Sequence, residues 1–270
     1  MPMMPMHAES QAEGGCPIHR AFAMSGIFER SSNRFCRPLA LALTLIALVL
    51  AALPARAASP ELEKVLRQMD AASAQFKSAQ ADFRWEQYTM VVQSTDVQSG
   101  TVYFRRNGKS TQMAAQIRQL NGRNDPKTLV YDGQQLQLFQ PKINQITYFS
   151  PGSNKDQYES FLTLGFGGSG KDLQANWDIT FAGYETLKDG AQSIQTAHLE
   201  LVSKTASVRN MFSRISIWVD PTHGVSLKQV FTEPTGDSRT AYYFAIRVNS
   251  SIDSGAFTIK APSNVTKVRR

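Results

Sequence analysis

Apolar and polar residues alternate through most of the chain between residues 81 and 248, and this period of two constrains the fold more than any other feature. Successive side chains of an extended chain point to opposite faces, so the alternation is typical of half-buried β-strands. The clearest run places Thr240, Tyr242, Phe244, Ile246 and Val248 at alternate positions. We expect these five side chains on the buried face of one strand.

Hairpin signals such as Asn107-Gly108, Asn121-Gly122 and Asp132-Gly133 separate the alternating runs. Strands joined by such short turns must be antiparallel. About eleven strands are predicted, near residues 81–92, 97–105, 110–118, 127–132, 135–140, 143–149, 177–183, 193–202, 212–219, 225–232 and 238–248.

A sheet of this size must curl or split to bury its apolar face. An eleven-stranded barrel is wider than the size that side chains fill by themselves, so an apolar hollow would remain unless a long central helix filled it. The two predicted helices are short, so they could cover the mouth of such a barrel more easily than fill its interior. The alternative is a packed sandwich with no hollow.

Helical signals occur in two places. Ser59-Pro60-Glu61 is typical of a helix start, and an apolar stripe at helical spacing follows as far as Phe76. Residues 155–164 break the alternation and predict a second short helix, and the glycine-rich residues 165–170 predict a flexible hinge or lid loop. One domain, residues 58–270, is the simplest account.

The N-terminal 57 residues have the pattern of an export signal. An uncharged apolar run covers residues 39–53, arginines precede it, and Ala55-Arg56-Ala57 follows as a cleavage pattern. We expect residues 1–57 to be a cleaved signal peptide with an N-terminal extension, and an uncleaved anchor is the alternative. The exported chain would then lie in the periplasm.

Removal of that leader also removes both cysteines, Cys16 and Cys36, and leaves two histidines, His198 and His223. This excludes a disulfide scaffold and a thiol nucleophile, and it takes away the usual metal ligands. We expect no metal and no cofactor. Five arginines and three glutamates precede residue 58, so the net charge falls from +7 to +5. Export excludes a nucleic-acid partner, and the basic C-terminus is expected to be solvated.

The sequence gives little support for an enzymatic function. Residues 165–172, GFGGSGKD, resemble a phosphate-binding loop, but Asp172 stands where a hydroxyl residue is needed and a strand is expected to follow. Ser169 lacks the flanking pattern of a nucleophile elbow. We therefore expect a protein that is not an enzyme. A lipid hydrolase that uses Ser169 stays open as an alternative.

Short motifs resemble a known family. Residues 129–141, LVYDGQQLQLFQP, followed by Gln145-Ile146-Thr147, are similar to a strand, turn and strand pattern of the periplasmic outer-membrane lipoprotein carriers of the LolA type. Residues 255–262, GAFTIKAP, resemble the closing strand of that family. The order of leader, amphipathic helix, strands, short helix and further strands also agrees.

The resemblance implies a mainly β fold, an unclosed antiparallel β-barrel capped by short α-helices. Its apolar cavity would take lipoprotein acyl chains from an inner-membrane lipoprotein-releasing transporter and deliver them to an outer-membrane acceptor, and the protein would act as a monomer. A family arginine that hydrogen-bonds the lid backbone and holds the empty form closed matches Arg106, although Asn107 replaces the expected proline; Arg105 is the competing candidate. A periplasmic sensor of lipids or lipoproteins with the same fold is the alternative function, but such sensors usually carry a second domain, for which about 213 residues leave no room.

The residues expected to line the cavity and lid are apolar members of the runs described above. They are Leu62, Val65, Leu66, Met69, Phe83, Trp85, Val102, Phe104, Leu136, Leu138, Phe161, Leu162, Leu164, Ile215, Ile217, Tyr242, Phe244 and Ile246.

Overall fold

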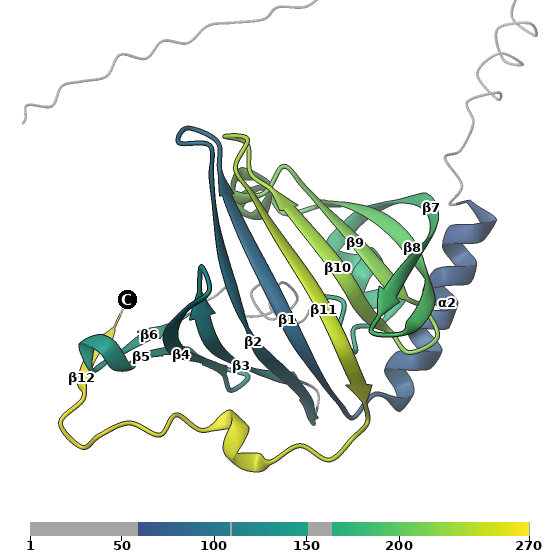
Figure 1. Ribbon diagram of the computed structural model, residues 1–270. Coiled ribbons are helices and arrows are strands. Elements are labelled where there is room, and N and C mark those ends of the chain that lie inside the picture. The colour runs from purple at the N-terminus through teal and green to yellow at the C-terminus, as the bar shows by residue number, and fades with distance from the viewer. Residues whose placement is uncertain (1–58, 109, 151–163, 270) are drawn as a thin grey trace, which may run out of the picture. The chain divides into compact units, whose positions relative to one another are not determined.

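A computed structural model describes residues 59–108, 110–150 and 164–269. Within these residues, twelve strands form a single sheet that does not close on itself. The strand order is β12-β6-β5-β4-β3-β2-β1-β11-β10-β9-β8-β7, and the edge strands β12 and β7 are not paired with each other (Figure 1). The predicted unclosed antiparallel sheet is therefore confirmed, and a sandwich of two packed sheets is not what forms.

The strands are β1 (Ser78–Thr89), β2 (Ser94–Asn107), β3 (Ser110–Leu120), β4 (Arg123–Tyr131), β5 (Leu136–Gln140), β6 (Gln145–Phe149), β7 (Trp177–Asp189), β8 (Gln192–Ser203), β9 (Arg214–Asp220), β10 (Val225–Thr232), β11 (Ser238–Val248) and β12 (Thr266–Arg269). The helical elements are α2 (Pro60–Gln75), α4 (Gly170–Asn176), α5 (Ala206–Met211), η1 (Pro141–Ile143) and η3 (Ser254–Phe257).

All eleven expected strands are present, and the one that the sequence missed is β12. It pairs in parallel with β6, from Thr266 opposite Gln145 to Arg269 opposite Tyr148. Two of its four residues are basic, and the strand is too short for an alternation that would separate it from a solvated tail. The last strand is thus positioned by its partner rather than by its own pattern.

Helix α2 begins where the sequence predicts. The Ser59 side chain accepts a hydrogen bond from the Leu62 backbone N–H at 3.2 Å, and Pro60 occupies the first turn, where its missing N–H costs nothing. The apolar stripe of α2 is buried against the sheet. No helix among the described residues is both long enough and apolar enough to cross a bilayer.

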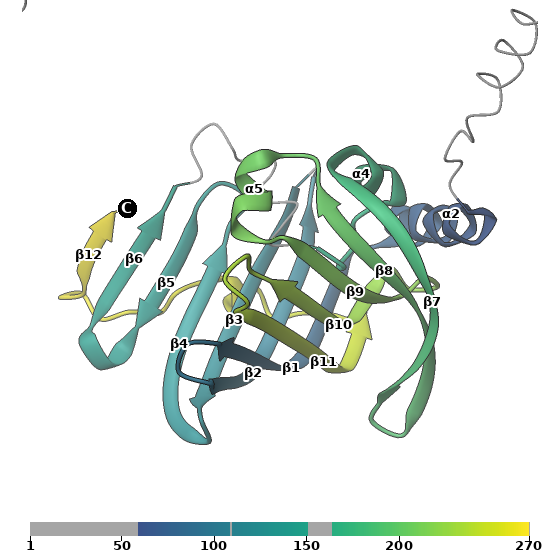
Figure 2. The same ribbon diagram turned by 90° about the horizontal axis from the view of Figure 1, so that it is seen from above.

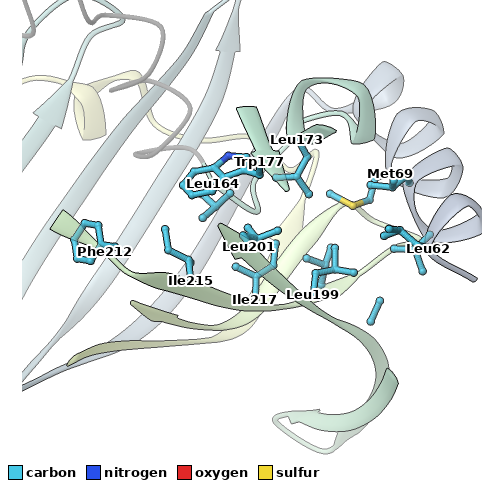
Figure 3. Packing of buried hydrophobic residues seen from close by; sticks show 14 of the residues in the cluster. Leu62, Met69, Leu164, Leu173, Trp177, Leu199, Leu201, Phe212, Ile215 and Ile217 are labelled. Carbon is cyan, nitrogen blue, oxygen red and sulfur yellow. The ribbon is translucent and has the colours of Figure 1, made fainter. Parts of the chain in front are cut away.

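The stripe of α2 belongs to a first apolar core, which is closed by β7 to β9 and by the two short helices α4 and α5 (Figure 3). Leu199, Ile215 and Ile217 lie at its centre with no exposed surface. The side chains of this first core are Leu62, Val65, Leu66, Met69, Leu164, Leu173, Trp177, Ala197, Leu199, Leu201, Val208, Phe212, Ile215, Ile217 and Val219.

The register of β11 corrects one prediction. Tyr242 and Phe244 lie on the outer face, where Phe244 is 41% exposed, and Tyr243 is the buried residue. The β1–β11 pairing shifts by one residue between Gln80 and Asp82, at a bulge where Ala245 has φ +52°. An extra residue in a strand moves the side chains on one side of the bulge to the opposite face of the sheet. Of the five side chains expected on the buried face, only Ile246 and Val248 therefore point inward.

After β11 the chain crosses to the far edge of the sheet before it forms β12 (Figures 1 and 2). On the way, η3 packs against the outer face, where the Phe257 ring lies edge-on to Tyr103 and 4.2 Å from the Arg105 guanidinium. The expected closing strand at residues 255–262 is therefore wrong: a short helix and an irregular segment occupy these positions.

Candidate functional site

The central strands carry a second apolar core on the face toward which α2 lies, and this inner face is the candidate site. Phe83, Val102, Phe104 and Tyr131 are almost fully buried in it. The buried members of this second core are Phe76, Ala79, Ala81, Phe83, Val102, Phe104, Met113, Ala115, Ile117, Tyr131, Leu136, Phe166, Val225, Ala241 and Tyr243. Almost all come from β1 to β5, β10 and β11.

Residues 164–169, which we call the lid segment, contact both cores: Leu164 packs in the first core and Phe166 in the second. Backbone hydrogen bonds join the segment to the start of β10: the Ser226 N–H donates to the Gly165 carbonyl at 2.7 Å, and the Gly167 N–H donates to the Gly224 carbonyl at 3.2 Å. Phe166 and Val225 form an isolated antiparallel bridge between these bonds. The bridge and the two hydrogen bonds thus hold the segment against the start of β10.

Phe166 is the side chain that the lid segment inserts into the core. Only 1% of it is exposed. Its ring stacks on Phe104 with centroids 4.0 Å apart and meets Tyr243 edge-on at 4.8 Å. Phe166 therefore gives the apolar side chains of the sheet a partner from the protein itself.

Polar groups fasten the same segment at two points. The Gly167 carbonyl accepts hydrogen bonds from the Ser73 hydroxyl at 2.7 Å and from Arg106 Nη2 at 2.6 Å. At the other end, Gln229 Nε2 donates to the Leu164 carbonyl at 2.5 Å. Each of these contacts joins the lid segment to a different element: α2, β2 or β10.

Gln229 also links the lid to the core through Tyr243. The Tyr243 hydroxyl lies 3.3 Å from Gln229 Oε1 and donates to it. Burial raises the pKa of the Tyr243 phenol, so the hydroxyl stays protonated and keeps this donor role.

Arg106 and Arg105 lie on opposite faces because they are neighbours on one strand. Arg106 reaches the lid segment and also approaches the Ser73 carbonyl at 3.4 Å. Arg105 lies on the outer face, where its Nε donates to Gln112 Oε1 at 2.7 Å and its guanidinium lies over the Phe257 ring. Of the two candidates, Arg106 has the lid contacts that the resemblance implies.

Two glycines, Gly167 in the lid segment and Gly170 at the start of α4, lie very close to α2 and its C-cap residue Phe76. A Cβ at Gly167 would lie 2.3 Å from the Phe76 ring, and a Cβ at Gly170 would lie 2.4 Å from the Leu66 carbonyl oxygen. Gly167 also has φ +75°, a conformation that other residues rarely adopt. Gly167 therefore allows the lid segment, and Gly170 the start of α4, to approach α2 and its C-cap residue closely.

A cavity of about 300 Å³ remains at one end of the second core, on the side of Tyr243 and Met113. Its lining includes apolar side chains such as Trp85, Leu129 and Phe231. Glu86, Asp96 and Arg239 are among its polar lining residues. The inner face is therefore not completely filled.

The structure divides the expected cavity residues between the two cores. Leu62, Val65, Leu66, Met69, Leu164, Ile215 and Ile217 pack in the first core, and Phe83, Val102, Phe104 and Leu136 are buried in the second, with Trp85 and Ile246 against it. Leu138 is half-buried on the same face of β5 as Leu136. Tyr242 and Phe244 lie outside, and Phe161 and Leu162 fall outside the described residues, as does most of the helix expected at 155–164.

Sequence reasoning missed Phe166, Tyr243 and Met113. Phe166 lies between two glycines, a context that we interpreted as flexibility. Its signal was available: a large aromatic residue in a glycine-rich segment is costly to expose and is a candidate for burial. Tyr243 was missed because the bulge of β11 cannot be seen in the alternation.

Other groups considered for catalysis have structural partners. Ser169 caps α4, a helix that the sequence did not predict, by accepting from the Asp172 N–H at 3.0 Å. His198 lies 2.8 Å from Glu200, and His223 lies 2.6 Å from Asp220. Among the residues that the structure describes, no three potential metal ligands gather.

Comparisons with known proteins give similarity of fold only. No family model and no curated protein matches this chain. Similar solved structures include an uncharacterized conserved protein from Thermus thermophilus, with 12% identity, a TM-score of 0.48, and coverage of 78% of this chain and 99% of that one. MucB has 12% identity and a TM-score of 0.47, with 78% and 66% covered.

A third similar structure is a LolA superfamily protein from Nitrosomonas europaea, with 13% identity, a TM-score of 0.37, and coverage of 73% of this chain and 97% of that one. At these scores the similarity concerns the fold alone, and the function has to be inferred from this chain's own geometry.

Proposed function

We propose that this protein is a periplasmic carrier that takes up the acyl chains of lipoproteins on the inner face of its sheet and moves them from the inner to the outer membrane. One observation carries the proposal: Phe166 fills an apolar site as part of a short segment that hydrogen bonds to α2, β2 and β10 hold in place. An acyl chain offers the same kind of surface to Phe104 and Tyr243 that the Phe166 ring now offers.

The size of the cavity supports a closed form that must open. Ligand sites have volumes of about 300–1,000 Å³, and the cavity at the end of the second core lies at the lower limit at about 300 Å³. Tyr243 lines this cavity and also contacts Phe166, so withdrawal of Phe166 would extend the apolar space along the core. An acyl chain would then lie along the inner face of β1, β2 and β11.

The energetics favour binding and make release the harder step. Each methylene withdrawn from water contributes about 0.8 kcal/mol, so a partly buried acyl chain suffices for tight binding. The lid segment offsets part of this gain, because its return offers the apolar face another partner. The net affinity is therefore the difference between ligand burial and Phe166 burial.

The carrier role requires two partners, an inner-membrane transporter that releases lipoproteins and an outer-membrane acceptor. Depletion of the protein should leave lipoproteins in the inner membrane, as detected by fractionation and immunoblotting. Normal sorting in the depleted strain would refute the carrier role. Mass spectrometry of the natively purified protein should identify a lipoprotein or its acyl chains, and a protein that carries no lipid would refute uptake itself.

The alternative function, a periplasmic sensor of lipids or lipoproteins, would use the same cavity but would have a different effect in the cell. A sensor would leave lipoprotein sorting intact on depletion and would change an envelope-stress response instead. The depletion experiment therefore separates the two functions, whereas detection of a bound lipid does not.

A further inference from the structure

The tip of the β1–β2 hairpin exposes three consecutive apolar side chains. Met90, Val91 and Val92 are 53%, 91% and 66% exposed. Val91 is the most exposed of the large hydrophobic residues in the described part of the chain. Water contact with such a run is unfavourable, so a protein that displays it gains by covering it.

The tip is held in place rather than left loose. The Met90 N–H donates to Asp237 Oδ1 at 2.8 Å, which ties the tip to the β10–β11 turn. A Cβ at Gly236 would lie 2.3 Å from the Met90 sulfur, so the two turns pack closely. The Gln93 N–H closes the turn on the Met90 carbonyl at 3.2 Å. Val91 and Val92 are thereby presented outward.

The tip lies at the same end of the sheet as the cavity. The cavity lining includes Glu86, Gln87 and Asp96 from the two strands that form the tip, together with Arg239 and Thr240 from the start of β11. A ligand that left the cavity at this end would emerge close to Met90, Val91 and Val92.

The geometry points to a docking tip for the surface of a lipid bilayer: Val91 and Val92, with Met90 behind them, insert among lipid headgroups and place the cavity end at the membrane. The surface is a narrow projection, which suits a soft interface better than a protein partner that needs a broad complementary area. Strands β1 and β2 already pair with each other beside the turn, so no free backbone edge invites strand addition.

The charged residues near the tip favour contact with lipid through apolar side chains rather than through electrostatic attraction. Asp237 and Glu233 lie in the adjacent turn, and Glu233 pairs with Arg239 at 3.1 Å. No excess of cations faces the tip among these residues, so attraction to anionic lipids is not the driving force. Binding should depend on apolar contact and should be insensitive to salt.

The experiment uses the chain from residue 58. Residues 57–270 form a compact unit of their own, and removal of the apolar leader excludes vesicle binding by the leader itself. Co-sedimentation with phosphatidylcholine vesicles should decline at least tenfold for Val91→Asp. The control Ile143→Asp makes the same change at a residue that is 58% exposed in another turn and should bind within twofold of the parent chain. Binding should be equal at low salt and at high salt.

A second variant reports insertion directly. The chain from residue 58 contains no cysteine, so Val91→Cys can be labelled alone with an environment-sensitive fluorophore. The label should shift to shorter wavelength when vesicles are added, and a label at Ile143→Cys should not shift. Absence of vesicle binding by the parent chain, equal loss in both aspartate variants, or no shift at position 91 would each overturn the inference.

This inference extends the proposed function, and its failure can be distinguished from failure of that function. Val91→Asp leaves the second core and Phe166 untouched, so uptake of a free fluorescent fatty acid should be unchanged. Loss of vesicle binding with normal uptake supports the docking tip. Normal vesicle binding with no uptake would refute the carrier cavity and leave the tip standing.

Discussion

A single carbonyl oxygen, that of Gly167, joins the lid segment to both α2 and β2. It accepts from the Ser73 hydroxyl at 2.7 Å and from the Arg106 guanidinium at 2.6 Å. Hydrogen bonds from a charged donor are stronger than neutral ones. Arg106 therefore stabilises the closed arrangement more than a neutral residue in its place would.

Replacement of Arg106 by Leu should increase the affinity for acyl chains. The bond from a partly exposed guanidinium contributes about 1.4 kcal/mol, so the dissociation constant for a fluorescent fatty acid should fall by up to about tenfold. The matched control is Arg105→Leu, which changes the neighbouring residue on the outer face and should leave this constant unchanged. An equal effect of both variants, or weaker binding by Arg106→Leu, would contradict a latch role.

Replacement of Gly167 by Ala should loosen the lid segment. The added methyl would meet the Phe76 ring at 2.3 Å and would also occupy a strained φ, at a combined cost of about 1–3 kcal/mol or more. The control Gly108→Ala has φ +62° and no atom within 4 Å, so it carries the strain without the clash. Urea unfolding should show the larger loss for Gly167→Ala, and equal losses would refute the packing explanation.

At the scale of elements, the alternation and the turn residues predicted where the strands lie. They did not always predict which side chains of a strand point to the buried face. Asn121-Gly122 adopts the two positive φ values that a tight hairpin needs, as its sequence predicts. The bulge at Ala245 has no sequence signal, because its conformation is imposed by pairing with β1 and by the Asp189 carboxylate, which accepts from the Ala245 and Ile246 N–H groups. Short elements such as α4 and β12 were missed for the same reason: tertiary contacts decide them.

The lid segment behaves as an element of its own, with a testable response to ligand. Its backbone bonds involve the amides of Ser226 and Gly167, and both should break when an acyl chain displaces Phe166. Hydrogen exchange at these two amides should become faster when a fatty acid binds. The amide of Leu199, at the centre of the first core, should keep its protection. Unchanged or slower exchange at both lid amides would mean that the ligand binds without moving the segment.

A second test at this scale concerns the junction between β4 and the β5–β6 turn. Asp125 lies 2.8 Å from Lys127 on its own strand and 2.7 Å from Lys142 in η1. Hydrogen bonds from Lys127 first, and then from Lys142, lower the pKa of the Asp125 carboxyl. A lowered pKa in the folded state means that the ion pairs stabilise the protein above the unfolded pKa of about 3.9 and lose this effect as the pH falls through the folded value.

Asp125→Asn should therefore lower the urea midpoint at neutral pH and should match the parent chain in strong acid, below the folded pKa. Asp178→Asn changes an exposed carboxyl that forms no ion pair within the described part of the chain, so this control should change little at either pH. A deficit of Asp125→Asn that persists in acid would show that the carboxylate charge is not the cause.

At the scale of the whole described sheet, two apolar cores differ in how they are covered. The first is closed mainly by α2, α4 and α5 and by the strands themselves, with Leu164 as the one member from the lid segment, whereas the second is covered in part by Phe166 of that segment. The sequence predicted one continuous apolar face and placed α2 and the inner side chains of β1 and β2 correctly. It could not predict which part of that face would be permanently filled, because that depends on where Phe166 comes to lie.

The central claim is that an acyl chain takes the place of Phe166 on the second core, and photo-cross-linking tests it most directly. A fatty acid with a diazirine near its terminal methyl group should label inner-face residues such as Phe83, Phe104 and Tyr243, as read by mass spectrometry of the digested protein. Phe166→Trp places a larger ring in the site that Phe166 occupies, so this variant should reduce the labelling. Labelling confined to the outer face or to the first core, with none on the inner face of β1, β2 and β11, would contradict the account.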